Sequence, residues 1–118
     1  MNIYEYSFEK LDVWKKSRKL VVKIYKLTKA FPEDEKFGLV SQMRRAAVSV
    51  TANIAEGSSR LSKKDQSHFY QIGYSSLIEL LNHLYISLDL AYLTEDYFKE
   101  IKSDMVEVLR MLNALYKS

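Results

Sequence analysis

Two adjacent arginines, Arg44 and Arg45, stand in the segment SQMRRAAVSVTANIAEG, which covers residues 41–57. The planar guanidinium fork binds either a phosphate or a carboxylate through paired hydrogen bonds. Neighbouring residues on a helix point about 100° apart, so the two arginines cannot share one narrow face. An antiparallel hairpin that turns near Ser59 would bring Glu79 close to them. We favour pairing of Arg44 or Arg45 with Glu79, within one molecule or between copies, because buried or interface ion pairs preferentially use arginine, and we keep phosphate binding as the alternative.

The end of the same segment carries Asn53 and Glu56, followed by Gly57 and Arg60. A glycine readily adopts the left-handed conformation that ends many helices, so we expect Gly57 to follow the last helical residue. Glu56 then lies where the helix dipole disfavours a negative charge, which indicates a specific partner, and Arg60 is the nearest basic residue. We expect Asn53 to hydrogen-bond the backbone of the turn. We therefore interpret Asn53 and Glu56, like Glu79, as structural polar residues.

The two histidines form no recognisable catalytic or metal-binding pattern. His68 has only Asp65 as a nearby carboxylate, and His83 follows Glu79 at the i,i+4 spacing of an ordinary helical pair. Di-iron bundles use a Glu-x-x-His spacing instead. The sequence also lacks cysteine, a phosphate-binding P-loop and a nucleophile elbow. We therefore predict a non-enzymatic protein with no catalytic residue, no metal ligand and no cofactor.

Positive charge gathers in the first half of the chain. Residues 1–64 hold 14 Lys/Arg and 7 Asp/Glu, whereas residues 65–118 hold 4 and 8, although the net charge of the whole chain is only +3. A basic surface attracts nucleic acid. From charge alone, we favour attraction between the two halves, within one molecule or between copies, since solvated lysine faces are common on helices. If nucleic acid binds, the residues that we expect to contact it are Lys15, Lys16, Arg18, Lys19, Lys23, Lys26, Arg44, Arg45, Arg60, Lys63 and Lys64.

The low glycine and proline contents and the long 3.6-residue apolar periods predict an all-α protein. We expect a tail over residues 1–8 and a single bundle domain over residues 9–118. The expected helices run from 8 or 9 to 30, from among 33–35 to 56 with Gly38 inside, from an N-cap at 62 to 93, and from an N-cap at 94 onwards. Because the connections are short, we expect an up-down-up-down antiparallel four-helix bundle.

The third expected helix is apolar over most of its circumference. The residues that widen its apolar surface are Phe69, Tyr70, Ile72, Tyr74, Leu77, Ile78, Leu80, Leu81, Leu84, Tyr85, Ile86, Leu88 and Tyr92. A helix of this kind is buried on several sides. One small bundle cannot cover it completely, so we expect a second copy of the chain to do so.

We find no targeting segment and no membrane-spanning segment in the sequence. The N-terminal stretch MNIYEYSFEK lacks the apolar core and the cleavage site of a signal peptide. The most apolar run, over residues 77–93, is interrupted by Glu79, Asn82, His83, Ser87 and Asp89. We therefore expect a cytoplasmic protein with no membrane partner.

Four segments carry a resemblance to a known family. They are FEKLDVW (8–14), IYKLTKAFP (24–32), EKFGLVSQMRRAAVSVTANIAEGSSR (35–60) and IELLNHL (78–84). With these segments the chain resembles the four-helix bundle proteins encoded in intervening sequences of bacterial 23S ribosomal RNA, also called S23 ribosomal proteins. The resemblance implies a homopentameric ring of bundles. It also implies a fold similar to that of the accessory protein of diversity-generating retroelements, a basic pentamer that associates with reverse transcriptase and nucleic acid.

Two functional hypotheses follow. The first is a non-enzymatic oligomeric bundle that binds RNA or DNA through the basic face, with other copies of the chain as its partners. The alternative is a protein–protein interaction scaffold that does not bind nucleic acid and docks its basic half on an acidic surface of a partner protein. A fold-level analogy does not decide between them.

Overall fold

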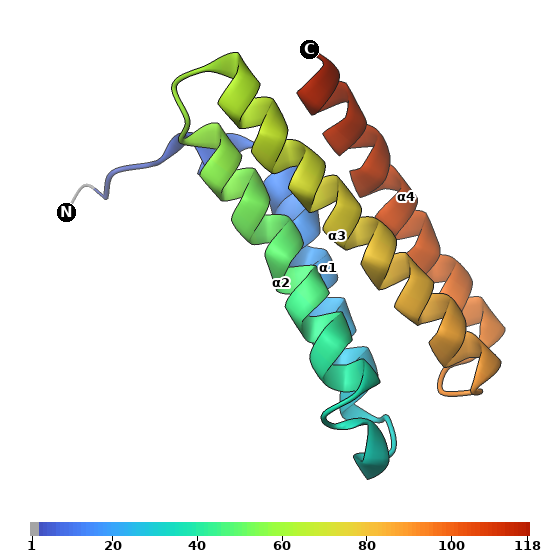
Figure 1. Cartoon of the computed structure of the whole chain (residues 1–118). Helices are drawn as coiled ribbons and strands as arrows, with labels where there is room; N and C mark the ends of the chain where they lie inside the picture. Colours follow the sequence, from blue (N-terminus) through green and yellow to red (C-terminus); the bar gives the residue numbers. More distant parts are fainter. Residues whose placement is uncertain (1–2) are drawn as a thin grey trace.

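The structure, a computed structural model, describes residues 3–118 and is built from four α-helices (Figure 1). The α-helices are α1 (Asp12–Lys29), α2 (Leu39–Ser58), α3 (Lys63–Asp89) and α4 (Glu95–Lys117), and two short 3-10 helices, η1 (Ser7–Lys10) and η2 (Glu33–Glu35), precede α1 and α2. Within residues 3–118 there is no β-strand. The predicted all-α, four-helix fold class is confirmed.

Consecutive helices run antiparallel and pack side by side (Figure 1). Helix α1 packs against α2 and α4, and α3 packs against the same two helices, so that α1 and α3 lie on one diagonal of the bundle. Short connections impose this arrangement, because a helix that returns after a few residues must lie beside the one before it. The four helices therefore follow the predicted up-down-up-down course.

The core lies between the four helices and receives one apolar stripe from each. Its largest fully buried side chains are Ile24, Met43, Val50, Ile54, Leu77, Leu80, Leu84, Ile101, Met105, Val108 and Leu112. Their spacings of three and four residues place them on one face of each helix. Three isoleucines of α3 remain on the surface, with exposed fractions of 37% at Ile72, 44% at Ile78 and 40% at Ile86. The expectation that one bundle leaves part of α3 uncovered is therefore confirmed.

The first helix begins later than predicted, at Asp12. Residues 7–10 form the separate turn η1, in which the backbone N–H of Tyr6 donates to a carboxylate oxygen of Glu9 at 2.7 Å. Leu11 is extended, and the ring of Phe8 returns against Trp14 with the ring centroids 4.9 Å apart. The extended backbone of Leu11 separates η1 from α1, and the aromatic contact joins the two elements.

The second helix also begins later, and Gly38 lies at its N-cap and not in its interior. The acidic residues 33–35 form the separate turn η2. Glu35 still serves α2, because its Oε1 accepts a hydrogen bond from the backbone N–H of Leu39 at 3.3 Å. A Cβ on Gly38 would lie 2.8 Å from that same oxygen. Glycine thus leaves room for the carboxylate of Glu35, which a larger residue would shift from its position at the helix start.

The prediction that Gly57 follows α2 in the left-handed conformation is wrong. Gly57 is buried inside the helix, which continues to Ser58 and has Ser59 as its C-cap. A Cβ on Gly57 would lie 2.6 Å from Cε1 of Tyr70 and 3.2 Å from the carbonyl oxygen of Gln66. The glycine therefore allows close approach of α3, which a sequence motif for helix ends does not reveal.

The third and fourth helices begin where predicted. The Ser62 and Thr94 hydroxyls accept hydrogen bonds from backbone N–H groups three residues later, each at 3.1 Å. Helix α3 ends at Asp89, before the predicted residue 93, because Ala91 is left-handed at φ 61°. The N–H of Tyr92 then donates to the carbonyl of Ser87, a bond typical of a Schellman motif.

The predicted tail covers residues 1–8, of which residues 1 and 2 lie outside the described part. Residues 3–6 have no regular secondary structure, and Figure 1 shows them extending away from the bundle. Across residues 3–118, no helix combines the length and the apolar character that a membrane crossing requires.

Candidate functional site

The basic side chains of α1 divide into two groups that face different surroundings. Lys15, Arg18, Lys19, Lys26 and Lys29 are exposed on the side of α1 that faces away from the core, and we call them the outer basic row. Among residues 3–118, no member of this row forms a salt bridge. Four of the five were predicted as contacts. Lys29 was left out, although it follows Lys15 by almost four whole helical turns and so shares its side of the helix.

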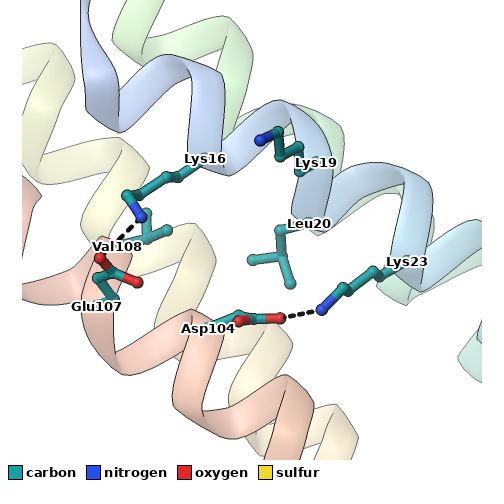
Figure 2. Close-up of a pocket in the computed structure, with 7 residues that line it drawn as sticks. All are labelled: Lys16, Lys19, Leu20, Lys23, Asp104, Glu107 and Val108. Atoms are coloured by element: carbon teal, nitrogen blue, oxygen red, sulfur yellow. Dashed lines mark hydrogen bonds and ion pairs between the residues drawn. The ribbon is translucent and has the colours of Figure 1, made fainter.

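The second group of α1 lysines is paired with acidic residues of α4. The Nζ of Lys16 lies 2.8 Å from a carboxylate oxygen of Glu107, and the Nζ of Lys23 lies 2.6 Å from one of Asp104 (Figure 2). The hydrogen bonds to these carboxylates raise the pKa of both lysines above the ordinary value of 10.5. Lys16 and Lys23 were predicted as contacts for nucleic acid, but their charges are already engaged within the bundle.

The two ion pairs border a shallow cleft between α1 and α4. The cleft holds about 140 Å³ and has Leu20 and Val108 at its floor. Figure 2 shows Lys19 on its rim, turned away from both carboxylates. Attraction between the basic and acidic halves within one molecule, which charge alone favoured, is thus confirmed for these two pairs.

Arg44 lies in the seam between α1 and α2, so its predicted pairing with Glu79 within one chain is wrong, whereas pairing between copies stays a prediction. Its Cζ lies 4.5 Å from the ring centre of Tyr25, and its Nε donates to Oγ1 of Thr28 at 2.9 Å. Its Nη2 donates to the carbonyl of Tyr25 at 3.3 Å. Arg44 points toward α1, whereas Glu79 lies on α3, on the opposite side of α2. Arg45 is exposed on the outer face of α2 and forms no salt bridge within the described residues.

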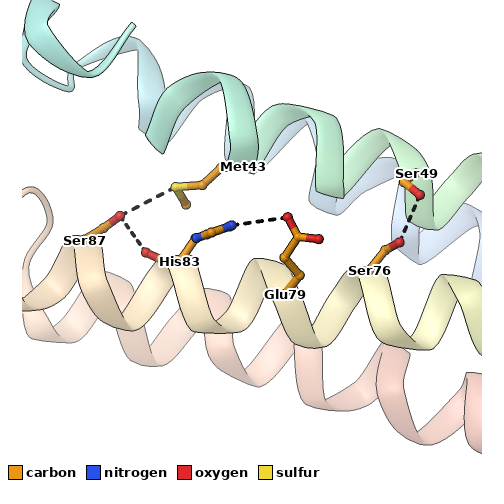
Figure 3. A network of polar contacts seen from close by, with 6 residues as sticks. All are labelled: Met43, Ser49, Ser76, Glu79, His83 and Ser87. Carbon is orange, nitrogen blue, oxygen red and sulfur yellow. Dashed lines mark hydrogen bonds and ion pairs between the residues drawn. The ribbon is translucent and has the colours of Figure 1, made fainter. Parts of the chain in front are cut away.

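Glu79 pairs with His83 on its own helix, at 3.3 Å between Oε2 and Nε2 (Figure 3). This i,i+4 pair was predicted, and the side chain of Glu79 is 50% exposed. Figure 3 also shows Ser49 of α2 facing Ser76 of α3, with their hydroxyl oxygens 2.9 Å apart. Small polar residues, and no arginine, therefore occupy the seam between α2 and α3.

The turn between α2 and α3 carries a third basic group. The predicted pair of Arg60 with Glu56 is confirmed at 3.2 Å, and the guanidinium of Arg60 also lies 4.6 Å from the ring centre of Phe69. Asn53 donates to the carbonyl of Ser49 at 2.8 Å within α2, so its predicted bond to the turn is wrong. The length of its side chain suits the preceding helical turn better than the loop.

Lys63 and Lys64 are exposed at the first turn of α3, beyond Arg60. The eleven predicted contacts therefore do not form one basic face. They lie on the outer side of α1, in the α1–α4 cleft, in the α1–α2 seam, on the outside of α2 and at the α2–α3 turn. The outer basic row is the largest of these groups with free charges.

Within residues 3–118, no cluster of three or more His, Asp or Glu side chains has the proximity that a metal ion requires. His68 is exposed and lies edge-on to Phe69, 5.5 Å between ring centres. The Nδ1 atom of His83 is buried without a hydrogen-bond partner, between α2 and α3. Neither histidine lies beside a nucleophile that it could activate.

Comparison with known proteins agrees with this fold. Residues 9–114 match the model of the 23S rRNA-intervening sequence protein family. A crystal structure of a protein with unknown function from the S23 ribosomal protein family of Bacteroides thetaiotaomicron VPI-5482 is similar, with a TM-score of 0.83 and 26% sequence identity. The match covers 90% of this chain and 96% of that chain. No curated protein sequence matches the chain.

The similarity to the accessory protein of diversity-generating retroelements stays a prediction. The family match, in contrast, extends over α1, α2, α3 and η2, over η1 except for its first two residues, and over α4 except for its last three. The chain therefore belongs to the 23S rRNA-intervening sequence protein family.

Proposed function

We propose that this protein is a non-enzymatic, oligomeric four-helix bundle that binds RNA or DNA through the outer basic row of α1. The proposal rests on the observation that some basic side chains of α1 are paired with carboxylates and others are not. Lys16 and Lys23 are neutralised by α4, whereas the five members of the outer row form no salt bridge with any residue that the structure describes. Unpaired cations on one side of a helix attract phosphates and release counterions when they bind.

We favour nucleic acid as the partner because the outer basic row presents only positive charges. Four lysines and one arginine follow each other along one helix, and no acidic residue of α1 lies among them after Asp12. The family name refers to an intervening sequence of 23S rRNA, so fragments of that RNA are a suitable first probe.

Assembly with further copies of the chain is part of the proposal. The exposed Ile72, Ile78 and Ile86 on α3 give a second copy an apolar surface to cover. Oligomerisation would also multiply the number of basic rows per particle, and several weak phosphate contacts on one particle bind with much higher affinity than one. Light scattering on a gel-filtration column, with and without RNA, measures the subunit number and the bound RNA together.

The binding test uses two variants that remove the same charge from the same helix. Lys19→Ala/Lys26→Ala removes two members of the outer row, and Lys16→Ala/Lys23→Ala removes the two paired lysines. Each lysine that contacts a phosphate contributes about one unit to the slope of log K against log salt. We expect the outer variant to lower the affinity for a 23S rRNA fragment by about tenfold or more at low salt, and to reduce this slope by about two.

The paired variant serves as the matched control, since long-range attraction changes equally in both variants. It should retain most of the affinity. Equal losses in the two variants would show that only the net charge matters, and no shift of any RNA or DNA fragment by the oligomer at low salt would contradict the proposal.

A protein scaffold remains the second candidate because of one further feature of the outer row. Val22 is 50% exposed at its centre, and Val22, Lys15, Arg18 and Lys19 line a mainly apolar hollow of about 210 Å³. Such a hollow suits an apolar side chain of an acidic partner protein. Pulldown before and after nuclease treatment distinguishes the candidates, because a partner retained after digestion supports the scaffold.

A further inference from the structure

Arginine guanidinium groups already lie over the aromatic rings beside the outer basic row. The Cζ of Arg18 lies 5.3 Å from the ring centre of Trp14, and the Cζ of Arg44 lies 4.5 Å from that of Tyr25. Arg44 is held there by its hydrogen bonds to Thr28 and to the backbone of Tyr25. A nucleobase could stack on these faces only by displacing a cation that the fold has fixed in place.

The other side of Trp14 is restricted as well. The ring of Phe8 meets it edge-on, with 4.9 Å between centroids, and Trp14 is only partly exposed. Proteins that bind single strands without sequence preference rely on open aromatic faces on which successive bases stack. An arginine covers one face of each of the two rings of α1, although Tyr25 is 41% exposed, so the row offers a partner more charge than open stacking surface.

The geometry of the row suits a rigid line of phosphates. From Lys15 to Lys29 the helix rises by about 21 Å. The opposite side of α1 is buried in the core through Leu20, Ile24 and Leu27, so the row cannot bend to follow a flexible strand. A duplex presents about one phosphate charge per 1.7 Å of axis, a density that a straight row of cations can use along its whole length.

The row carries few of the side chains that read bases. Its exposed residues are four lysines, Arg18 and Val22, without the Asn or Gln side chains that recognise adenine. Lys and Arg contact guanine where an element enters the major groove of DNA, and the major groove of A-form RNA is too deep and narrow for side chains to read. Because the opposite side of α1 is packed into the bundle, we expect the row to lie along the backbone and its contacts to end on phosphates, whose positions depend on the shape of the duplex.

We propose that the outer basic row binds double-stranded nucleic acid along its phosphate backbone, independently of sequence. This inference rests on the proposed function and adds the class of partner. Duplex RNA and duplex DNA both present a phosphate backbone, and the experiment distinguishes between them.

The experiment measures fluorescence anisotropy of the full-length protein with four labelled probes at low salt. They are an RNA duplex of about two helical turns, a second duplex of scrambled sequence, a DNA duplex of equal length, and the unpaired strand of the first duplex. We expect either duplex RNA or duplex DNA to bind at least about tenfold more tightly than the single strand. The scrambled duplex should bind within about threefold of the first, because no base is read.

Two substitutions test the stacking argument directly. Tyr25→Leu removes the ring under Arg44, and Phe37→Leu removes the most exposed ring near the end of α1, which is 90% exposed. Neither substitution changes the charge. We expect the affinity for duplex and for single strand to change by less than about threefold in both variants, once circular dichroism has shown that they fold.

The outcomes separate the two proposals. Equal or tighter binding of the single strand, or a large loss of single-strand affinity in Phe37→Leu or Tyr25→Leu, would overturn the duplex inference and leave nucleic-acid binding intact. Strong discrimination between the two RNA duplexes would overturn sequence independence. Failure of all four probes to bind would contradict the proposed function itself.

Discussion

The bundle joins its helices in two different ways, as the α2–α3 seam and the α1–α4 seam show. Between α2 and α3 the helices approach closely at Gly57, where an added Cβ would lie 2.6 Å from Cε1 of Tyr70 and 3.2 Å from the carbonyl oxygen of Gln66. Between α1 and α4 a cleft remains open, bordered by the Lys16–Glu107 and Lys23–Asp104 pairs. The first seam depends on shape, and the second depends partly on charge.

The difference between the two seams indicates at which positions a substitution should leave the protein stable. Close packing around Gly57 leaves no room for an added methyl group, because protein interiors are packed as densely as crystals. Exposed ion pairs, in contrast, contribute little and are weakened by salt. The α2–α3 seam should therefore dominate stability, while the α1–α4 seam mainly determines which lysines of α1 stay free for a partner.

The strongest test of the comparison is Gly57→Ala in the α2–α3 seam. The added Cβ would lie 2.6 Å from the buried ring of Tyr70, so either the ring or the helix must move. We expect a loss of about 1–3 kcal/mol in the free energy of unfolding, measured by urea denaturation.

Gly73→Ala is the matched control, because its Cβ would meet only ordinary contacts of 3.6 Å. Its higher helix propensity, about 1 kcal/mol over glycine, should make the variant neutral or more stable. If Gly57→Ala were as well tolerated as Gly73→Ala, the close approach at Tyr70 would not limit the seam.

A smaller effect is expected in the α1–α4 seam from Lys23→Met, which keeps an apolar stem but removes the ion pair with Asp104. Both side chains of the pair are 38% exposed, so solvent screens it. We expect a loss of about 0.2–1 kcal/mol in the free energy of unfolding at low salt. The loss should shrink in about 1 M NaCl, where the Debye length falls to roughly 3 Å. Lys19→Met, in which the lysine has no partner, should cost less at low salt, and an equal cost would contradict a role for the pair.

The smallest effect is a dependence of stability on alkaline pH. Carboxylates raise the pKa of Lys16 and Lys23 above 10.5 in the folded state, and the hydrogen bond to Glu35 raises the pKa of Tyr92 above 10.0. Each group thus keeps its proton longer when folded than when unfolded. Their contribution is complete below the unfolded pKa and is lost as the pH rises through the folded pKa.

We therefore expect the free energy of unfolding to fall as the pH rises from about 10. In Lys16→Met/Lys23→Met the fall should be smaller, and Tyr92→Phe should reduce the remainder. Urea denaturation at several pH values between neutral and strongly alkaline measures this. The same pH dependence in the double variant as in the unchanged protein would show that the α1–α4 pairs do not contribute.

Much of the fold could be predicted because it depends on local and periodic properties. Apolar spacing along the chain marked the buried stripes that contain Ile24, Ile54 and Leu112, and the hydroxyls of Ser62 and Thr94 marked two helix starts. The i,i+4 pairs were predictable for the same reason, since both partners lie on one helix. Two of the errors, at Gly38 and Gly57, arose where a glycine makes room for a capping carboxylate or for a neighbouring helix.

The candidate site was predictable only as a set of residue types. The sequence alone determined an all-α chain with positive charge concentrated in its first half, because composition and helical periodicity are properties of the chain itself. Only the tertiary structure decided which charges remain free. Lys15 and Lys16 are adjacent and identical in type, but only Lys16 lies near Glu107, a residue far along the chain. Partners of this kind are chosen by the packing of helices, which brings together residues whose separation in sequence carries no signal.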